Sequence, residues 1–335
     1  MKFKVLFLFN SVIILINFIY GINNIKDNYI NGCHLSMIDT LKYKHMIPAP
    51  INTRIASYEF ISPFIGILDM PEVDGQSKKQ FRIIDIKLLN EIKWDEIEIQ
   101  EGFKHKSLIT LGTNNESFYV LSGGMVVYKL NSRGIIEREI VLEKSLEFSW
   151  MINSKIVVSK DKLFIILKSE NCRINNTEGI NCLRLFIYDL NGKIIKIIPI
   201  DNENIKSSNL SIFGNEVKIK LFNNHLLVFN SITNILLDYN LVTEDVLYKK
   251  LNDLDGLKAK NIKDIIIQNG IIKILSSDQM NNLYLVNFNI AMNKANILDT
   301  KLKNIFWASF EKKLCLRIHK TGLQQEIELF SLQLP

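Results

Sequence analysis

One short pattern recurs along the chain and restricts its fold more than any other feature of the sequence. A Tyr, Phe or Ile, then any residue, then Leu or Ile, follows an apolar run and precedes a polar turn. The copies are Ile84-Asp85-Ile86, Tyr128-Lys129-Leu130, Tyr188-Asp189-Leu190, Tyr239-Asn240-Leu241, Phe288-Asn289-Ile290 and Phe330-Ser331-Leu332. Successive copies lie about 40–60 residues apart, the spacing of repeats that bury their apolar faces by stacking on one another.

Between these copies the sequence is typical of β-strands. Short β-branched runs such as Leu163–Leu167, Leu226–Phe229 and Ile271–Leu275 are divided by Asn, Gly, Asp and Ser. Such runs favour strands over helices. Asn191-Gly192 stands between two of them and indicates a hairpin turn, because Asn and Gly tolerate positive φ. The sequence therefore predicts an all-β fold.

Over roughly residues 50–335 the repeat resembles β-propellers, and the six-bladed type in particular. The resemblance implies a single propeller domain over residues 51–335 with about six blades, or seven if residues 22–70 hold a degenerate one. The last copy is followed only by a few residues to Pro335, too few for an outer strand. We therefore expect an N-terminal segment, for instance Ile51–Phe60, to supply that strand and close the ring, which would also protect two sheet edges.

Residues 1–21 have the layout of a signal peptide. Lys2 and Lys4 precede an apolar stretch, Val5–Ile19, of about 15 residues, whereas a membrane-spanning helix needs about 20. We expect a cleaved leader and a secreted, lumenal or periplasmic protein without a stable membrane span, and residues 22–50 should form a loop-rich lead-in. The alternative is an uncleaved leader that anchors the chain in a membrane.

The cysteines and glycosylation sequons are relevant to the same question of cellular compartment. Cys172 and Cys182 flank a polar segment between two strand-like runs, so in an oxidising compartment they should form a disulfide. Cys33 with Cys315 is a second candidate pair, and free thiols are the alternative for both. Sequons occur at Asn115, Asn175 and Asn209, and each is a candidate glycosylation site if the host uses them.

The charge argues against nucleic acid as a partner. The formal net charge is +6, and Lys and acidic residues are interspersed without a basic block. Such a balance favours solubility over nucleic-acid or anionic-membrane binding. We expect a monomer.

No catalytic residue can be assigned from a motif. The chain has no nucleophile elbow, zinc-protease motif, Walker loop or dinucleotide fingerprint. The densest acidic groups that could hold Ca²⁺ in an axial channel are Asp69 with Glu72 and Asp74, and Asp253 with Asp255. Asp is also a common turn residue, so these groups predict no metal site on their own.

Two functions follow from these observations. The first is a binding or scaffold module that recognises a protein or a glycan, with no cofactor, because no catalytic signature is present. The alternative is a propeller hydrolase or lyase with an axial acidic or Ca-dependent site, since propellers carry both roles. We expect the axial pocket to separate them: three or more converging Asp, Glu or His side chains would favour the enzyme, and an apolar plug would favour binding.

Overall fold

The computed structural model describes the β-sheet framework of the chain. The residues described are 34–36, 43–45, 54–61, 64–70, 72–73, 76–77, 80–85, 90–92, 108–114, 116–123, 125–145, 148–169, 183–200, 217–231, 233–251, 254, 261–278, 280–300, 302–311, 314–321 and 324–333. Their regular elements are all strands, as the sequence predicts. Within these ranges no helix is long and apolar enough to cross a membrane.

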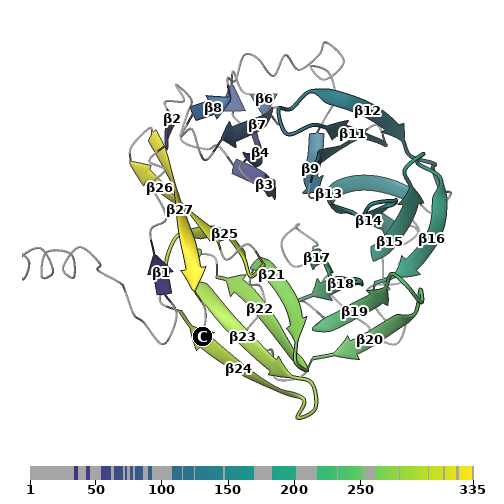
Figure 1. Cartoon of the computed structure of the whole chain (residues 1–335), viewed down its shortest axis with the longest axis vertical. Helices are drawn as coiled ribbons and strands as arrows, with labels where there is room; N and C mark the ends of the chain where they lie inside the picture. Colours follow the sequence, from purple (N-terminus) through teal and green to yellow (C-terminus); the bar gives the residue numbers. More distant parts are fainter. Residues whose placement is uncertain are drawn as a thin grey trace, which may run out of the picture.

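The described strands form six antiparallel sheets of four or five strands and one two-stranded ribbon, and the sheets are arranged radially in a ring (Figure 1). Given in chain order, the first five sheets are β3 (Arg54–Ile61), β4 (Phe64–Met70), β7 (Gln80–Asp85) and β8 (Asn90–Ile92); β9 (Leu108–Thr113), β10 (Phe118–Ser122), β11 (Val126–Leu130) and β12 (Ile136–Val141); β13 (Phe148–Val158), β14 (Lys162–Ser169), β15 (Leu183–Asp189) and β16 (Ile194–Pro199); β17 (Val217–Phe222), β18 (His225–Asn230), β19 (Ile235–Asn240) and β20 (Val246–Lys250); and β21 (Asn261–Gln268), β22 (Ile271–Ser277), β23 (Leu283–Asn289) and β24 (Lys294–Asp299). The sixth holds β25 (Ile305–Ser309), β26 (Leu314–Thr321) and β27 (Gln324–Gln333), with β1 (His34–Ser36) and β2 (Tyr43–His45) on β27; the ribbon is β5 (Glu72–Val73) with β6 (Gln76–Ser77).

The recurring motif marks one place in every sheet. Its six copies begin on β7, β11, β15, β19, β23 and β27, each the third strand of a different sheet. The aromatic rings of Tyr128, Tyr188, Tyr239 and Phe288 are fully buried between neighbouring sheets. Large aromatic side chains contribute most to such burial, which explains why the motif repeats once per sheet.

The middle residue of the motif shapes the turn that follows. Asp189 Oδ1 accepts hydrogen bonds from the backbone N–H groups of Asn191 and Lys193, at 2.8 and 2.9 Å. Asn240 Oδ1 does the same for the turn between β19 and β20. Gly192 has a φ of +85°, which confirms the predicted Asn191-Gly192 hairpin.

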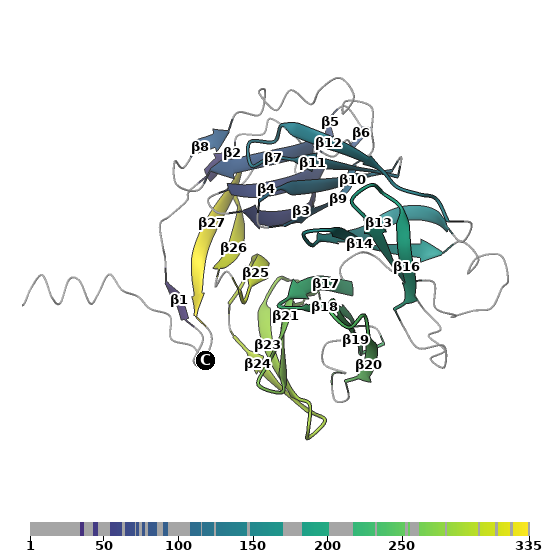
Figure 2. The same ribbon diagram turned by 45° about the vertical axis from the view of Figure 1, so that its right-hand side comes forward.

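The N-terminal strands meet the last sheet, although not through the predicted segment. Strands β1 and β2 both pair with β27 on the edge opposite β26, and both views place them beside it (Figures 1 and 2). The prediction that Ile51–Phe60 would fill this place is wrong, because β3 is the first strand of its own sheet and pairs with β4. Only two residues of sequence separate β3 from β4, so local pairing costs less loop-closure entropy than pairing with a distant strand.

Apolar layers between neighbouring sheets hold the ring together. Five clusters of buried hydrophobic residues join the sheets in succession, from the one that holds β3 to the one that holds β27. Between the first and last sheets, the rings of Phe60 and Trp307 lie 6.5 Å apart. Each fully buried Phe or Leu side chain stabilises the folded state by about 1.5–3 kcal/mol, so these layers dominate the stability of the ring.

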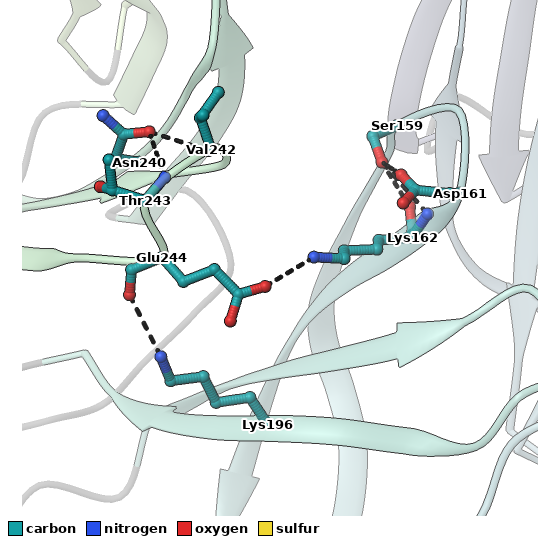
Figure 3. Close-up of polar contacts among 8 residues, drawn as sticks. All are labelled: Ser159, Asp161, Lys162, Lys196, Asn240, Val242, Thr243 and Glu244. Atoms are coloured by element: carbon teal, nitrogen blue, oxygen red, sulfur yellow. Dashed lines mark hydrogen bonds and ion pairs between the residues drawn. The ribbon is translucent and has the colours of Figure 1, made fainter.

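Polar contacts at the outside of the ring help to fix the position of one sheet relative to the next. Glu244, in the turn after β19, reaches the preceding sheet (Figure 3). Its Oε1 accepts a hydrogen bond from Lys162 Nζ at 3.0 Å, and its backbone oxygen accepts one from Lys196 Nζ at 3.2 Å. Exposed pairs of this kind contribute little to stability, but they help set how one sheet sits on the next.

Candidate functional site

A cavity of about 1010 Å³ lies on the axis of the ring. All six first strands, β3, β9, β13, β17, β21 and β25, contribute to its wall. The turns that follow β9, β13, β17 and β25 also line it, so the cavity reaches the face of the ring where those turns lie. Its volume matches that of the larger small-molecule sites in proteins.

Strand alternation explains how charged residues come to line this cavity. In β17, Val217 and Ile219 are buried in the apolar layer, although Ile219 also borders the cavity, and Lys218 and Lys220 alternate with them and line it. Successive side chains of a strand point to opposite faces, so the pattern Val-Lys-Ile-Lys places both ammonium groups on one side.

A β-bulge brings a third lysine to the same wall. The pairing of β21 with β22 shifts between Ile262 and Asp264, so Lys263 has no partner in the register. Lys263 and Asp264 consequently both line the cavity although they are consecutive. Bulges commonly redirect a side chain next to functional sites.

Asp264 is fully engaged in holding Lys220. Its Oδ2 lies 2.7 Å from Lys220 Nζ and also accepts a hydrogen bond from the Phe310 N–H at 2.7 Å. Its Oδ1 accepts one from the Ile265 N–H at 2.9 Å. Both side chains are almost completely buried, so this ion pair joins β17, β21 and the end of β25 as a structural unit.

Lys218 and Lys263 have no hydrogen-bond or ion-pair partner among the described residues. Burial, together with the positive charges of Lys218 and Lys155, lowers the pKa of Lys263 to about 7. An ammonium group that is desolvated beside other cations loses its proton more easily. About half of the Lys263 side chains are therefore neutral at pH 7.

Glu59, on β3, is the other titrating group of the cavity wall. Burial raises its pKa to about 7, with Lys218 opposing the rise and Asp264 adding to it. The Glu59 carboxyl thus carries only about half a charge at neutral pH. It does not neutralise the lysines, and the inner wall keeps an excess of positive charge.

The charges nearer the turns are paired or exposed to solvent. Lys129 Nζ lies 2.9 Å from Glu137 Oε2, and Lys162 binds Glu244 outside the cavity. The exposed charged residues of the lining are Glu116, Glu137, Arg138, Lys160, Asp161 and Glu311. The unbalanced charge therefore lies at Lys218 and Lys263, and an anion is the chemical group that this arrangement fits.

The acidic groups singled out from the sequence do not meet in the cavity. Asp69 lies on β4 and Glu72 on β5, and Asp74, Asp253 and Asp255 lie outside the described residues. Across the described part of the chain, no three His, Cys, Asp or Glu residues are grouped as metal ligands.

The lining is neither of the two arrangements expected from the sequence. Six carboxylate side chains line it, but no three of them are grouped among the described residues, and it is no apolar plug because Lys218, Lys220 and Lys263 lie on its inner wall. The sequence-based reasoning missed Glu59, Lys218 and Lys263. The available signal was the Lys-Ile-Lys alternation of β17, which is also typical of a solvent-facing strand.

The remaining candidate residues either have structural roles or lie outside the described residues. Cys315 is a free, buried thiol on β26, and burial raises its pKa to about 12. Trp307 packs beside Phe60 and also lines the cavity. Outside the described residues lie the leader 1–21, most of the lead-in 22–50, Cys33, Cys172, Cys182, Asn115, Asn175 and Asn209.

Radial four-stranded antiparallel sheets, with their first strands lining an axial cavity, define a β-propeller-like fold. No family model matches the chain, and no curated protein matches its sequence.

Solved structures with a similar arrangement include three from unrelated sequences. A member of the DUF4221 family from Bacteroides vulgatus has a TM-score of 0.47 at 10% identity, covering 91% of this chain and 99% of that one. BamB from Moraxella catarrhalis has a TM-score of 0.44 at 7% identity, covering 89% and 99%. A chain of a nidogen/laminin complex has a TM-score of 0.43 at 11% identity, covering 80% and 93%. At these TM-scores the likenesses carry no argument about function.

Proposed function

We propose that this protein is a propeller-type binding module whose site is the axial cavity, and that it binds an anionic group there. The observation that carries the proposal is the pair Lys218 and Lys263, which line the cavity from neighbouring first strands without a partner among the described residues. Holding desolvated like charges together is unfavourable, and an anion between them would reverse that cost. Such an arrangement is typical of a site completed by its ligand.

An anionic group can come from either class of partner expected from the sequence. An acidic side chain of a protein, or a uronate of an acidic glycan, supplies a carboxylate of the required kind. The cavity also has room for a free small molecule.

The alternative function, a hydrolase or lyase, rests on one carboxyl group. Glu59, with its pKa near 7, could transfer a proton, but glycoside hydrolysis needs a second carboxyl across the site. Asp264 cannot serve, because three donors hold its two oxygens. We therefore favour binding over catalysis.

The architecture and compartment complete the proposal. We propose that the six sheets are the full set of blades, and that β1 and β2 close the ring on β27. We also propose that residues 1–21 direct the chain into a secretory pathway, where Cys172 pairs with Cys182 and the sequons at Asn115, Asn175 and Asn209 are available. Non-reducing peptide mapping should link Cys172 to Cys182; alkylation of both thiols without reduction would refute that pair.

Thermal unfolding in the presence of phosphate and citrate tests the binding proposal. At constant ionic strength, each anion should raise the unfolding midpoint of the wild-type chain, because it binds only the folded state. The double variant Lys218→Gln/Lys263→Gln should lose this response. The control variant Lys250→Gln removes one lysine charge from the exposed outer strand β20 and should keep the response. An equal response in the double variant would contradict the proposal.

A further inference from the structure

A second, open cavity of about 580 Å³ adjoins the axial one. Asn223 and Glu311 line both cavities, so the two adjoin each other at the face where the turns after β17 and β25 lie. The turn after β21 completes the second cavity through Gln268 and Asn269. Three neighbouring sheets therefore build this extension of the site.

The second cavity differs from the first in its chemistry. Its wall carries four large apolar side chains, and Phe222, Ile267 and Phe310 among them are only partly buried. Among the described residues, this wall holds no lysine or arginine. It thus offers apolar surface that a ligand could remove from water, about 25 cal/mol for each Å² buried.

A negative charge lies where the two cavities meet, and it makes the outer cavity unfavourable for an anion. Glu311, exposed at the junction, carries a carboxylate whose Oε2 lies 3.9 Å from Lys220 Nζ. An anionic group would be repelled by Glu311 at the junction and attracted by Lys218 and Lys263 deeper inside. An uncharged apolar group has no such preference and can occupy the outer cavity.

We propose that the ligand is an amphiphilic anion, with its anionic head at Lys218 and Lys263 and its alkyl or aryl group in the cavity formed by Phe222, Ile267 and Phe310. This inference rests on the proposed function and narrows its ligand to one chemical class. The two adjoining cavities, one cationic and one apolar, carry it.

A matched set of probes separates the two parts of the ligand. Acetate carries the head alone, 1-octanol the tail alone, and octanoate both. Each methylene taken out of water improves affinity by up to about fourfold. Octanoate should therefore bind the full chain at least about tenfold more tightly than acetate or 1-octanol, and decanoate more tightly still. Isothermal titration calorimetry below the micelle concentration measures these affinities.

Variants locate the two contacts. Ile267→Thr keeps a β-branched residue in β21 but lowers its apolar surface; it should weaken octanoate severalfold and leave citrate unchanged. The double variant Lys218→Gln/Lys263→Gln should lose the binding of both octanoate and citrate, whereas Lys250→Gln should keep both. If Ile267→Thr does not fold, the comparison of acetate, octanoate and decanoate on the wild-type protein tests the inference by itself.

The outcomes distinguish this inference from the proposed function. If citrate binds but octanoate is no tighter than acetate, the amphiphile inference is wrong and anion binding stands. If octanoate binds the double lysine variant as well as the wild type, adsorption to apolar surface explains it and the inference is also wrong. If no anion binds, both proposals are wrong.

Discussion

Replacing Gly192 by alanine should destabilise the ring at the contact between two neighbouring sheets. Gly192 lies in the turn between β15 and β16 with a φ of +85°, a conformation that L side chains rarely adopt. A Cβ there would overlap the carbonyl oxygen of Val141 on β12, in the neighbouring sheet. The Gly192 oxygen also accepts a hydrogen bond from the Glu143 N–H at 2.7 Å, so the turn cannot move away freely.

The structure offers a control that separates the cost of the left-handed backbone conformation from the cost of the overlap with Val141. Gly270, in the turn between β21 and β22, has a φ of +72°, and a Cβ there would meet no atom within 4 Å. Gly270→Ala should therefore cost only the left-handed conformation, about 1–2 kcal/mol. Gly192→Ala should add the cost of overpacking, about 1–3 kcal/mol, for a total of about 2–5 kcal/mol.

Urea unfolding followed by intrinsic fluorescence measures this difference. Both variants should keep the wild-type dependence of free energy on urea, with a lower midpoint for Gly192→Ala than for Gly270→Ala. Equal midpoints would refute the reasoning, because the close approach of the turn to Val141 would then contribute nothing.

Three further predictions concern buried charge and the thiol. Lys220→Met should cost about 3–5 kcal/mol in urea unfolding, because it leaves Asp264 buried without its cation; a cost within the error of the midpoint would contradict a buried pair. The stability of the unliganded protein should pass through a minimum near pH 7. Glu59 binds more protons in the folded than in the unfolded state between pH 4.5 and about 7, so its contribution falls as pH rises there. Lys263 binds fewer in the folded state between about 7 and 10.5, so stability rises with pH over that range. Urea midpoints across pH should show both slopes; Glu59→Gln should flatten the acidic one and Lys263→Gln the alkaline one, and unchanged slopes would oppose the assignment. Cys315 should resist iodoacetamide at pH 8 in the folded protein and react in urea, since burial raises the thiol pKa to about 12; rapid native labelling would contradict its burial.

The repeat was predictable because its signal is local. The buried aromatic on the third strand of four of the sheets, followed by a residue such as Asp189 or Asn240 that caps the turn, depends on neighbours within a few positions. Each sheet therefore leaves its mark in the sequence independently of the rest of the ring.

Ring closure and the site depend on distant contacts, which a strand pattern does not encode. Whether β3 pairs with β4 or with β27 is decided by competition between a hairpin and a long-range pairing. Likewise, Lys218 has the pattern of a solvent-facing residue, and only the ring makes its face the axis. The bulge that brings Lys263 beside Asp264 has no sequence signal that we recognise.

Site-resolved acetylation tests the central claim most directly. The full chain is treated with a limiting acylating reagent at pH 7, with and without citrate, and the rate at each lysine is read by mass spectrometry. Bound citrate should slow the modification of Lys218 and Lys263 and leave the exposed Lys250 unchanged, because the anion covers the two amines. Equal rates with and without citrate at Lys218 and Lys263 would contradict an anion site in the axial cavity.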